Sequence, residues 1–363
     1  MKQRWYVPWL YILPTVLVLG LFLVYPTIET IWVSLHDNYY INADSSENPN
    51  APRKMFVGFD NYVEAFTDPS VNMGVAFRNN ALWLVLMTTL SVGLGLILAV
   101  LLDRVRYEVI AKSIIFLPMA ISFTAASIIW RFIYAYRPPN RPQIGLLNGL
   151  LESLSTIAND PIANQILVGA SILFGGIAIV LLLFGLRDRR YLGPFFASLV
   201  VVLLAQFILA QGGEFVPELW LSKQPWINNI ALIIAGAWVW TGFCMVILSA
   251  AYKGIPAELM EAARIDGATE WQVFWKITIP FMLSTIAVVT TTIVIFVLKT
   301  FDIVYVMTGG NFGTEVLANT MIKTMYDFRD FEKASAIAVI LLILIVPFIV
   351  INIRRFRAQE AMR

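Results

Sequence analysis

The stretch over residues 252–280 reads YKGIPAELMEAARIDGATEWQVFWKITIP and lies between two long apolar segments. Proline suits the first position of a helix, so Pro256 predicts the start of a short one, which good helix formers then continue. Gly267 suits the position just beyond a helix, where the backbone turns left-handed. A second amphipathic run follows and leads to Pro280, which opens the next apolar segment. The stretch therefore predicts two short helices joined by a fixed elbow at a membrane surface.

The two flanking segments belong to a set of apolar stretches that extends over the whole chain. Of the 363 residues, 59% are hydrophobic and 14% are charged, whereas a soluble domain is about 25% charged. A bilayer core needs about 20 mostly apolar helical residues. Eight stretches meet this length: 7–32, 81–102, 113–134, 166–186, 191–211, 227–252, 281–298 and 334–353. Pro26 interrupts the first, whose embedded part is expected to end near Tyr25. The predicted fold is an all-α membrane protein with about eight transmembrane helices.

The orientation of these helices is predicted from the positive charges, because cytoplasmic loops carry an excess of Lys and Arg. Eight crossings with an internal N-terminus place the tight clusters at 187–190 and 354–357 in the cytoplasm. The loops at 36–80 and 135–165, rich in Asn, Asp and Pro, are then external. This predicts a multi-pass protein of the bacterial plasma (inner) membrane with both termini in the cytoplasm.

The sequence contains no constellation typical of an enzyme or a metal site. The lone histidine, His36, has no cysteine or histidine cluster around it, and no phosphate-binding G-x-x-x-x-G-K-[ST] loop occurs. The net charge of +2 gives no basic surface for nucleic acid. We therefore expect no catalytic residue, no metal and no cofactor bound by this chain.

Two interpretations of the stretch over residues 252–280 remain open from its residues alone. It can be an amphipathic helix–turn–helix that rests on lipid headgroups. It also resembles the EAA loop of ABC importer permeases: Glu-Ala-Ala, three residues, Gly, nine residues, Ile-x-Leu-Pro. The matching residues here are Glu261, Ala262, Ala263, Gly267, Ile277 and Pro280, with Ile279 in place of the usual Leu.

The resemblance implies that this loop couples the chain to a separate ATP-hydrolysing subunit. In that family the first short helix docks into a groove of the ATPase, and movement of the ATPase pair is passed to the membrane helices. The residues implied in docking are Glu258, Glu261, Ala262, Ala263, Asp266 and Gly267. ATP and Mg²⁺ would be bound by the partner ATPase subunits.

Further segments extend the resemblance over most of the chain. FVGFDNY at 56–62, FLP at 116–118, WRF at 130–132 and YVMTGG at 305–310 resemble segments of maltose-permease-like sugar importers. The stretches 166–186 and 191–211 form an extra hairpin inside a type I importer core of six helices. Together with RPQIGLLN at 141–148, this hairpin resembles the α-glucoside permease subgroup. The implied organisation is an N-terminal helix (1–35), an external loop (36–80), two helices with an external loop (81–165), the inserted hairpin (166–211), the core with its coupling loop at 253–280 (212–353) and a cytoplasmic tail (354–363).

A sugar site needs aromatic faces and a few hydrogen-bonding groups, and two membrane segments supply both. By matching to the maltose permease pattern, the residues implied in substrate binding are Met119, Phe123, Gly236, Trp238, Trp240, Phe296, Val297 and Thr300. Each also has a structural interpretation, since membrane Trp often packs and Thr often bonds its own helix. Lys299 and Asp302 are costly near lipid and are expected to face a wet cavity or to extend outward.

The predicted function is that of a transmembrane permease subunit in an ATP-driven, binding-protein-dependent carbohydrate importer. Its implied partners are a second homologous permease, two ATP-binding-cassette subunits and an external sugar-binding protein. The substrate class is a di- or oligosaccharide such as an α-glucoside, or a glycosylated osmolyte. The alternative is a secondary sugar transporter driven by an ion gradient, which would favour inverted repeats and intramembrane acids. Neither is visible in the sequence.

Overall fold

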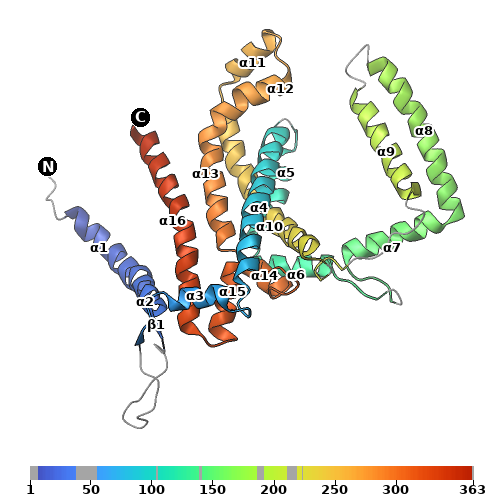
Figure 1. Cartoon of the computed structure of the whole chain (residues 1–363). Helices are drawn as coiled ribbons and strands as arrows, with labels where there is room; N and C mark the ends of the chain where they lie inside the picture. Colours follow the sequence, from blue (N-terminus) through green and yellow to red (C-terminus); the bar gives the residue numbers. More distant parts are fainter. Residues whose placement is uncertain are drawn as a thin grey trace. The chain divides into compact units, whose positions relative to one another are not determined.

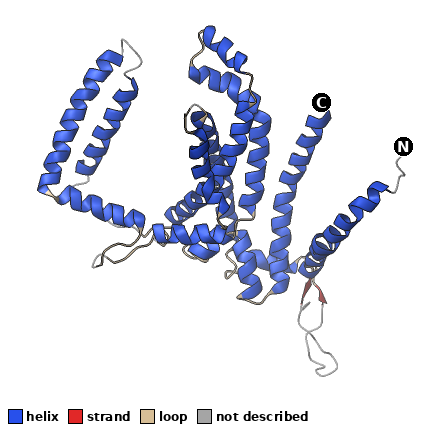
Figure 2. Cartoon of the chain, turned by 180° about the vertical axis from the view of Figure 1, so that it is seen from behind, coloured by secondary structure: helices blue, strands red, loops and turns tan. Residues whose placement is uncertain are grey.

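The computed structural model describes residues 7–37, 55–103, 105–138, 141–185, 192–210, 219–222 and 224–361. The chain divides into two compact units. Unit 1 comprises residues 1–128 and 224–363, and unit 2 comprises residues 129–223. The described residues are almost entirely helical (Figures 1 and 2). The strands among them are β1 (His36–Asp37) and β2 (Met55–Phe56), which pair antiparallel with His36 opposite Phe56.

All eight predicted apolar stretches correspond to helices. Six helices in the described part of the chain are long and apolar enough to cross a membrane: Tyr11–Ser34, Met73–Leu102, Pro161–Leu183, Pro225–Lys253, Glu270–Leu298 and Phe331–Arg354. A bent pair, Glu108–Ala120 and Phe123–Ile133, corresponds to the third stretch, and the shorter apolar helix Pro194–Ile208 to the fifth. This confirms the all-α membrane fold. The Arg cluster at 187–190 and residues 38–54 of the predicted external loop lie outside the described residues.

The helix of the first span continues past Pro26 to Ser34, and the expected end of its embedded part near Tyr25 stays a prediction. After α1 (Val7–Leu19), the backbone widens into the π-helical segment η1 (Gly20–Val24) and then continues as α2 (Tyr25–Ser34). The Tyr25 N–H donates to the carbonyl of Gly20, five residues earlier. Proline lacks an N–H and clashes with the carbonyl four residues before it. The wider π turn accommodates this defect without ending the helix.

The third span, in contrast, is broken rather than continuous. Helix α5 (Glu108–Phe116) passes into a 3₁₀ turn, η2 (Leu117–Ala120), that contains Pro118, and Ile121 is extended. The hydroxyl of Ser122 then accepts the N–H of Ala125 and restarts the chain as α6 (Phe123–Ile133), bent by 102° from the preceding helix. Proline and a capping serine so close together end one helix and start another. The bend places Phe123 at the first position of α6.

Helix α10 (Pro225–Lys253) is the centre of unit 1. It packs against α4 (Met73–Leu102), α5, α13 (Ile279–Leu298) and α14 (Asp302–Met307) (Figure 1). Two glycines permit the close approach: a Cβ on Gly95 of α4 would lie 2.5 Å from the Cβ of Cys244, and one on Gly242 would lie 2.5 Å from the carbonyl oxygen of Ile115. Small residues are the usual means by which membrane helices pack closely.

Buried asparagines hold the far end of unit 1 together. Helix α4 begins at Met73 and not at the predicted residue 81, so Asn79 lies within it and donates to the carbonyls of Gly313 and Glu315, both at 2.8 Å. Asn228 of α10 donates to the carbonyl of Phe312 at 3.0 Å. These bonds fix a tight turn between α14 and α15 (Leu317–Tyr326), in which Phe312 has a φ of 56°. The last helix, α16 (Phe331–Ala361), follows.

The FVGFDNY motif attaches α3 (Asp60–Thr67) to the end of the first span. Gly58 has a φ of 62°, which favours glycine, and lets the chain turn after β2. The Asn61 amide donates to the carbonyls of Ser34 and His36, and the Tyr62 hydroxyl pairs with that of Ser34 at 2.7 Å. His36 itself is 9% exposed and its ring nitrogen Nδ1 lies 2.7 Å from the carbonyl oxygen of Trp32.

Unit 2 contains α7 (Leu146–Asn159), α8 (Pro161–Gly185) and α9 (Leu192–Ala210). Helices α8 and α9 pack along each other as the predicted hairpin. The 141–148 motif forms the turn that precedes α7. Gln143 pairs with the backbone of Arg137 through both amide atoms, and Asn148 donates to the carbonyl of Ala135. Gly145 lies so close to Ala135 that a Cβ would overlap its carbonyl oxygen.

Candidate functional site

The predicted elbow is formed by local backbone hydrogen bonds. Helix α11 (Ala257–Ile265) begins after Pro256, and Gly267 has a φ of 83° two residues beyond its end. The N–H of Ala268 donates to the carbonyl of Ala263 at 2.9 Å, and that of Gly267 to Arg264 at 3.1 Å. This pair of bonds is the Schellman motif, which ends a helix on a left-handed residue. The expected role of Gly267 in ending the helix is confirmed.

The elbow has two arms, α11 before Gly267 and α12 (Glu270–Val273) after it, and a capping box fixes the start of the second arm. Thr269 precedes α12, its side chain accepts the backbone N–H of Gln272, and the Gln272 side chain accepts the N–H of Thr269. Across the elbow, Arg264 Nε lies 2.8 Å from Glu270 Oε1. Capping satisfies backbone groups that would otherwise need water. The two arms therefore hold a defined angle.

The second arm is not the separate helix that the sequence predicted. It continues through the π segment η4 (Phe274–Thr278) into α13, and the N–H of Ile279 donates to the carbonyl of Phe274. Pro280 follows at once, so the chain uses here the same solution as before Pro26: a π turn absorbs the proline. The second arm of the elbow is thus one continuous helical segment with the membrane helix α13.

The first arm of the elbow, helix α11, is exposed. No residue of α11 is buried, and Ile265 is 86% exposed. Of the residues implied in docking, Glu258, Glu261, Ala262, Asp266 and Gly267 are exposed and Ala263 is half-buried. An exposed helix with small residues on its surface and acidic residues around them is suited to close contact with a partner protein that carries basic groups.

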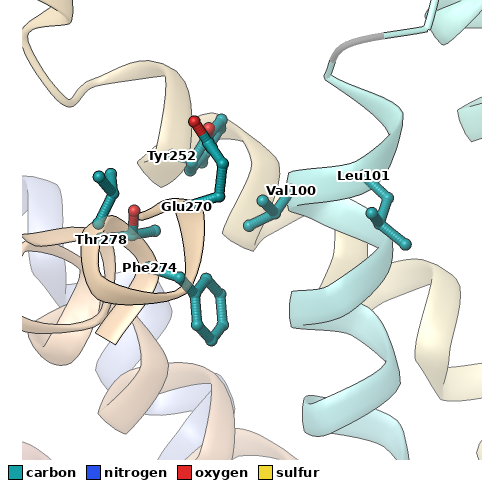
Figure 3. Close-up of a pocket in the computed structure, with 7 residues that line it drawn as sticks. Val100, Leu101, Tyr252, Glu270, Phe274 and Thr278 are labelled. Atoms are coloured by element: carbon teal, nitrogen blue, oxygen red, sulfur yellow. The ribbon is translucent and has the colours of Figure 1, made fainter. Parts of the chain in front are cut away.

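At its base the elbow meets α4 and α10. A pocket of about 180 Å³ lies there, lined by Val100, Leu101, Tyr252, Glu270, Val273, Phe274 and Thr278. Figure 3 shows Phe274 of the π segment and Val100 of α4 on opposite sides of it. Nearby, Lys253 at the end of α10 pairs with Glu108 of α5 at 2.6 Å. This charge pair joins α10 to α5 beside the base of the elbow, and the pocket shows that the base itself is not tightly packed.

A second pocket lies toward the other end of α13. Its volume is about 230 Å³, and it is lined by Phe123, Trp240, Phe296, Lys299, Thr300, Phe301, Asp302 and Ile303. Trp240 is 5% exposed. Its ring centroid lies 4.3 Å from that of Phe296 and 5.7 Å from that of Phe123. Three segments far apart in the sequence therefore build one aromatic wall with polar groups beside it, the composition that a carbohydrate requires.

The structure brings together four of the eight residues implied in substrate binding: Phe123, Trp240, Phe296 and Thr300. Trp238 is two positions from Trp240, so it points about 200° away around the helix. Val297 is fully buried and a Cβ on Gly236 would lie 3.0 Å from Met87, so these two residues are closely packed within unit 1 and do not line the pocket. Met119 lies in the 3₁₀ turn and does not line the pocket.

The pocket also contains residues that matching to a family pattern missed. Phe301 and Ile303 were not singled out from the sequence, and Lys299 and Asp302 were expected only to avoid lipid. Both charges were expected to face a cavity or to extend outward; they line the pocket and are exposed. Their signal in the sequence was the presence of two opposite charges at the end of an apolar span.

Comparisons with known proteins agree with this arrangement. Residues 91–360 match the family described as binding-protein-dependent transport system inner membrane component. The chain is 49% identical over 354 residues to the osmoprotective compounds uptake permease protein GgtC of Synechocystis sp., covering 98% of this chain and all of the relative. It is 39% identical over 348 residues to the alpha-glucoside transport system permease protein AglF of Rhizobium meliloti, covering 96% of this chain and 81% of the relative.

The fold also has a solved counterpart. A chain of the bacterial alginate ABC transporter, crystallised with an alginate pentasaccharide-bound periplasmic protein, superposes with a TM-score of 0.63 over 96% of this chain and 93% of its own length, at 17% identity. The family match covers most of the sequence, and two relatives exceed 30% identity over almost all of it. This chain belongs to the binding-protein-dependent transport system inner membrane components, and it is a multi-pass transport subunit rather than an enzyme.

Proposed function

We propose that the chain forms half of the translocation path in an ATP-driven importer of uncharged carbohydrates, such as an α-glucoside or a glycosylated osmolyte. The observation that carries the proposal is the pocket of Trp240, Phe123 and Phe296, since aromatic rings stack on the apolar faces of sugars. The names of two relatives, an α-glucoside permease and an osmoprotectant permease, support the same substrate class. An ion-gradient-driven carrier does not fit a family whose transport depends on a binding protein.

The complete transporter contains, in this proposal, a second homologous permease, two ATP-binding-cassette subunits and an external sugar-binding protein. The alginate transporter was crystallised with its periplasmic protein, which supports a partner of that kind. ATP and Mg²⁺ are held by the ATPase subunits. The elbow and both chain termini face the cytoplasm, and the pocket end of α13 faces outward.

The elbow passes the movement of the ATPase to the pocket through α13. Glu258, Glu261, Ala262, Ala263, Asp266 and Gly267 form the docking surface, and the arm after Gly267 continues without a break into α13. The other end of α13 carries Phe296, and Lys299 and Thr300 follow it directly. A displacement of the elbow therefore moves one wall of the pocket and alternates its access.

The coupling step is tested at Gly267, whose φ of 83° excludes proline. Gly267→Pro should lose sugar uptake in reconstituted vesicles while the complex still assembles and hydrolyses ATP. Gly267→Asn is the matched control, because asparagine tolerates the left-handed region, and it should keep most of the uptake. Full uptake by Gly267→Pro would refute the coupling role.

The substrate class is tested by ATPase stimulation with the binding protein loaded in turn with α-glucosides, other disaccharides, glycosylated osmolytes and amino acids. Trp240→Ala should lower stimulation by the preferred sugar more strongly than Trp238→Ala, because only Trp240 lines the pocket. Stimulation by amino acids alone would overturn the proposed substrate class. Uptake that survives ATP depletion but collapses with the ion gradient would overturn the proposed energy source.

A further inference from the structure

The pocket contains two opposite charges that do not form an ion pair with each other. Lys299 and Asp302 both line it, three residues apart in the turn between α13 and α14. Among the described residues, neither takes part in an ion pair. Ionisable side chains in membrane proteins usually face a cavity, pair with one another or serve a ligand, and these two exposed side chains line the pocket. Two charges this close in sequence that remain apart are available to a ligand.

Lys299 and Asp302 both have hydrogen-bonding capacity left for a ligand. Asp302 Oδ1 accepts a long hydrogen bond of 3.4 Å from the hydroxyl of Thr124 on α6, which leaves the second carboxylate oxygen without a hydrogen bond among the described residues. Lys299 is the residue that ends α13, and Thr300 beside it adds a hydroxyl to the same pocket. The pocket thus offers three donors on an ammonium, acceptors on a carboxylate and an aromatic wall.

We propose that Lys299 and Asp302 are specificity-determining residues that select uncharged, polyhydroxylated solutes and reject solutes of net charge. Lys299 donates to one hydroxyl group of the substrate and Asp302 accepts from another. An anionic substrate meets the carboxylate of Asp302, a cationic one meets the ammonium of Lys299, and a neutral polyol satisfies both. This inference deepens the proposed function and rests on it, since it concerns the same pocket.

The aromatic wall favours a sugar over a zwitterion as the ligand. A quaternary ammonium group needs several ring faces open around it. Here the rings of Trp240 and Phe296 contact each other at an interplanar angle of 38°, and Trp240 is only 5% exposed whereas Phe296 is 48% exposed, so few ring faces are open. A sugar needs one ring face for stacking and hydrogen-bonding partners around its rim, which this pocket supplies.

If Lys299 and Asp302 select the substrate by charge, removing either one should change which charged substrate binds. Residues that only stabilise the fold would not have this effect. Asp302→Asn leaves Lys299 as an uncompensated cation, so the pocket should come to favour an anionic substrate. Lys299→Met leaves Asp302 as an uncompensated anion, so it should come to favour a cationic one. The two variants should change charge preference in opposite directions, because each leaves a single charge, of opposite sign in the two cases, lining the pocket.

The experiment measures equilibrium binding to the complete permease–ATPase complex in lipid nanodiscs, with the binding protein omitted so that its own selectivity does not interfere. The probes are the neutral sugar that gives the strongest ATPase stimulation, its 6-carboxylate and 6-amino analogues, and glycine betaine. The wild-type complex should bind the neutral sugar at least about tenfold more tightly than either charged analogue. Asp302→Asn should raise the ratio of anionic to neutral binding by about tenfold, and Lys299→Met should lower it.

Two further variants make the result decisive. Lys299→Met combined with Asp302→Asn should abolish the charge preference and weaken binding of the neutral sugar. Asp327→Asn removes one negative charge outside the pocket and should leave the preference unchanged. Equal effects of both single variants on all three sugars, or tighter binding of betaine than of the sugar, would overturn the inference. If the wild-type complex binds no sugar, it is the proposed function that fails.

Discussion

Helices α8 and α10 are both long, apolar and able to cross a membrane, yet they are used differently. In the most apolar window of α10, 67% of residues are buried, whereas in that of α8 the share is 11%. Helix α10 packs against four other helices of unit 1, while α8 packs against α9 and α7 within unit 2. Hydropathy therefore identifies a membrane helix but does not tell whether its neighbours are protein or lipid.

Helices α10 and α8 differ in whether their small and polar residues contact a neighbouring segment of the protein. Lipid is as apolar as leucine, so membrane helices associate through close packing and hydrogen bonds rather than through the hydrophobic effect. On α10, Gly242 lies against the backbone of α5, and Asn228 and Asn229 bond the turn after α14. On α8, a Cβ added to Gly169, Gly175 or Gly176 would meet nothing within 4 Å. These three glycines of α8 therefore do not create a helix contact.

The largest contrast is expected for leucine-to-alanine substitutions in the two helices. Leu248 of α10 is fully buried and Leu183 of α8 is 64% exposed. Leu248→Ala should destabilise the protein by about 2–5 kcal/mol, because it leaves a cavity that the packed neighbours fill only in part. Leu183→Ala should stay within about 0.5 kcal/mol, because an exposed side chain leaves no cavity inside the protein when it is shortened. Unfolding in detergent micelles or nanodiscs measures both. Similar values for the two would show that α10 is not the packed centre of its unit.

A smaller contrast is expected for the glycines. A Cβ at position 242 would lie 2.5 Å from the carbonyl oxygen of Ile115 and 2.8 Å from the Cα of Phe116, both backbone atoms that can move only with their helix. Gly242→Ala should therefore cost about 1–3 kcal/mol through overpacking. Gly175→Ala should be neutral or slightly stabilising, since alanine is the better helix former. Thermal unfolding of the two variants compares them. A neutral Gly242→Ala would mean that α5 and α10 are not in contact.

The smallest effect concerns a polar anchor outside the spans of unit 1. The Ser70 hydroxyl and N–H donate to Asp68 Oδ1, and Lys333 donates to Oδ2 at 3.1 Å, which together lower the pKa of Asp68 from 3.8 to about 2. A depressed pKa stabilises the folded state above the unfolded pKa, and this stabilisation is lost as the pH falls through about 2. The midpoint temperature of thermal unfolding should therefore decrease as the pH is lowered from 5 to 2. Asp68→Asn should reduce that slope, and an unchanged slope would assign the pH dependence to other groups.

The sequence by itself determined the membrane class, the eight apolar helices and the elbow. These depend on local properties: the length of an apolar run, a proline that can start a helix, and a glycine that accepts a left-handed backbone. The termination of α11 at Gly267 was predicted because the Schellman motif needs only residues within one turn of each other. The EAA pattern could be recognised for the same reason.

Only the tertiary structure decided which residues share a pocket and where helices bend or continue. Pro26 and Pro280 are absorbed by π turns, whereas Pro118, which is followed by the capping Ser122, accompanies a 102° break, so a proline alone does not decide the outcome. Trp238 and Trp240 look equivalent in sequence, but Trp240 alone of the two faces Phe123 and Phe296. Only the structure shows that Lys299 and Asp302 line a cavity to which α6, α10 and α13 also contribute. The physical reason is that helix rotation and proximity depend on packing between distant segments, which no stretch of the sequence encodes alone.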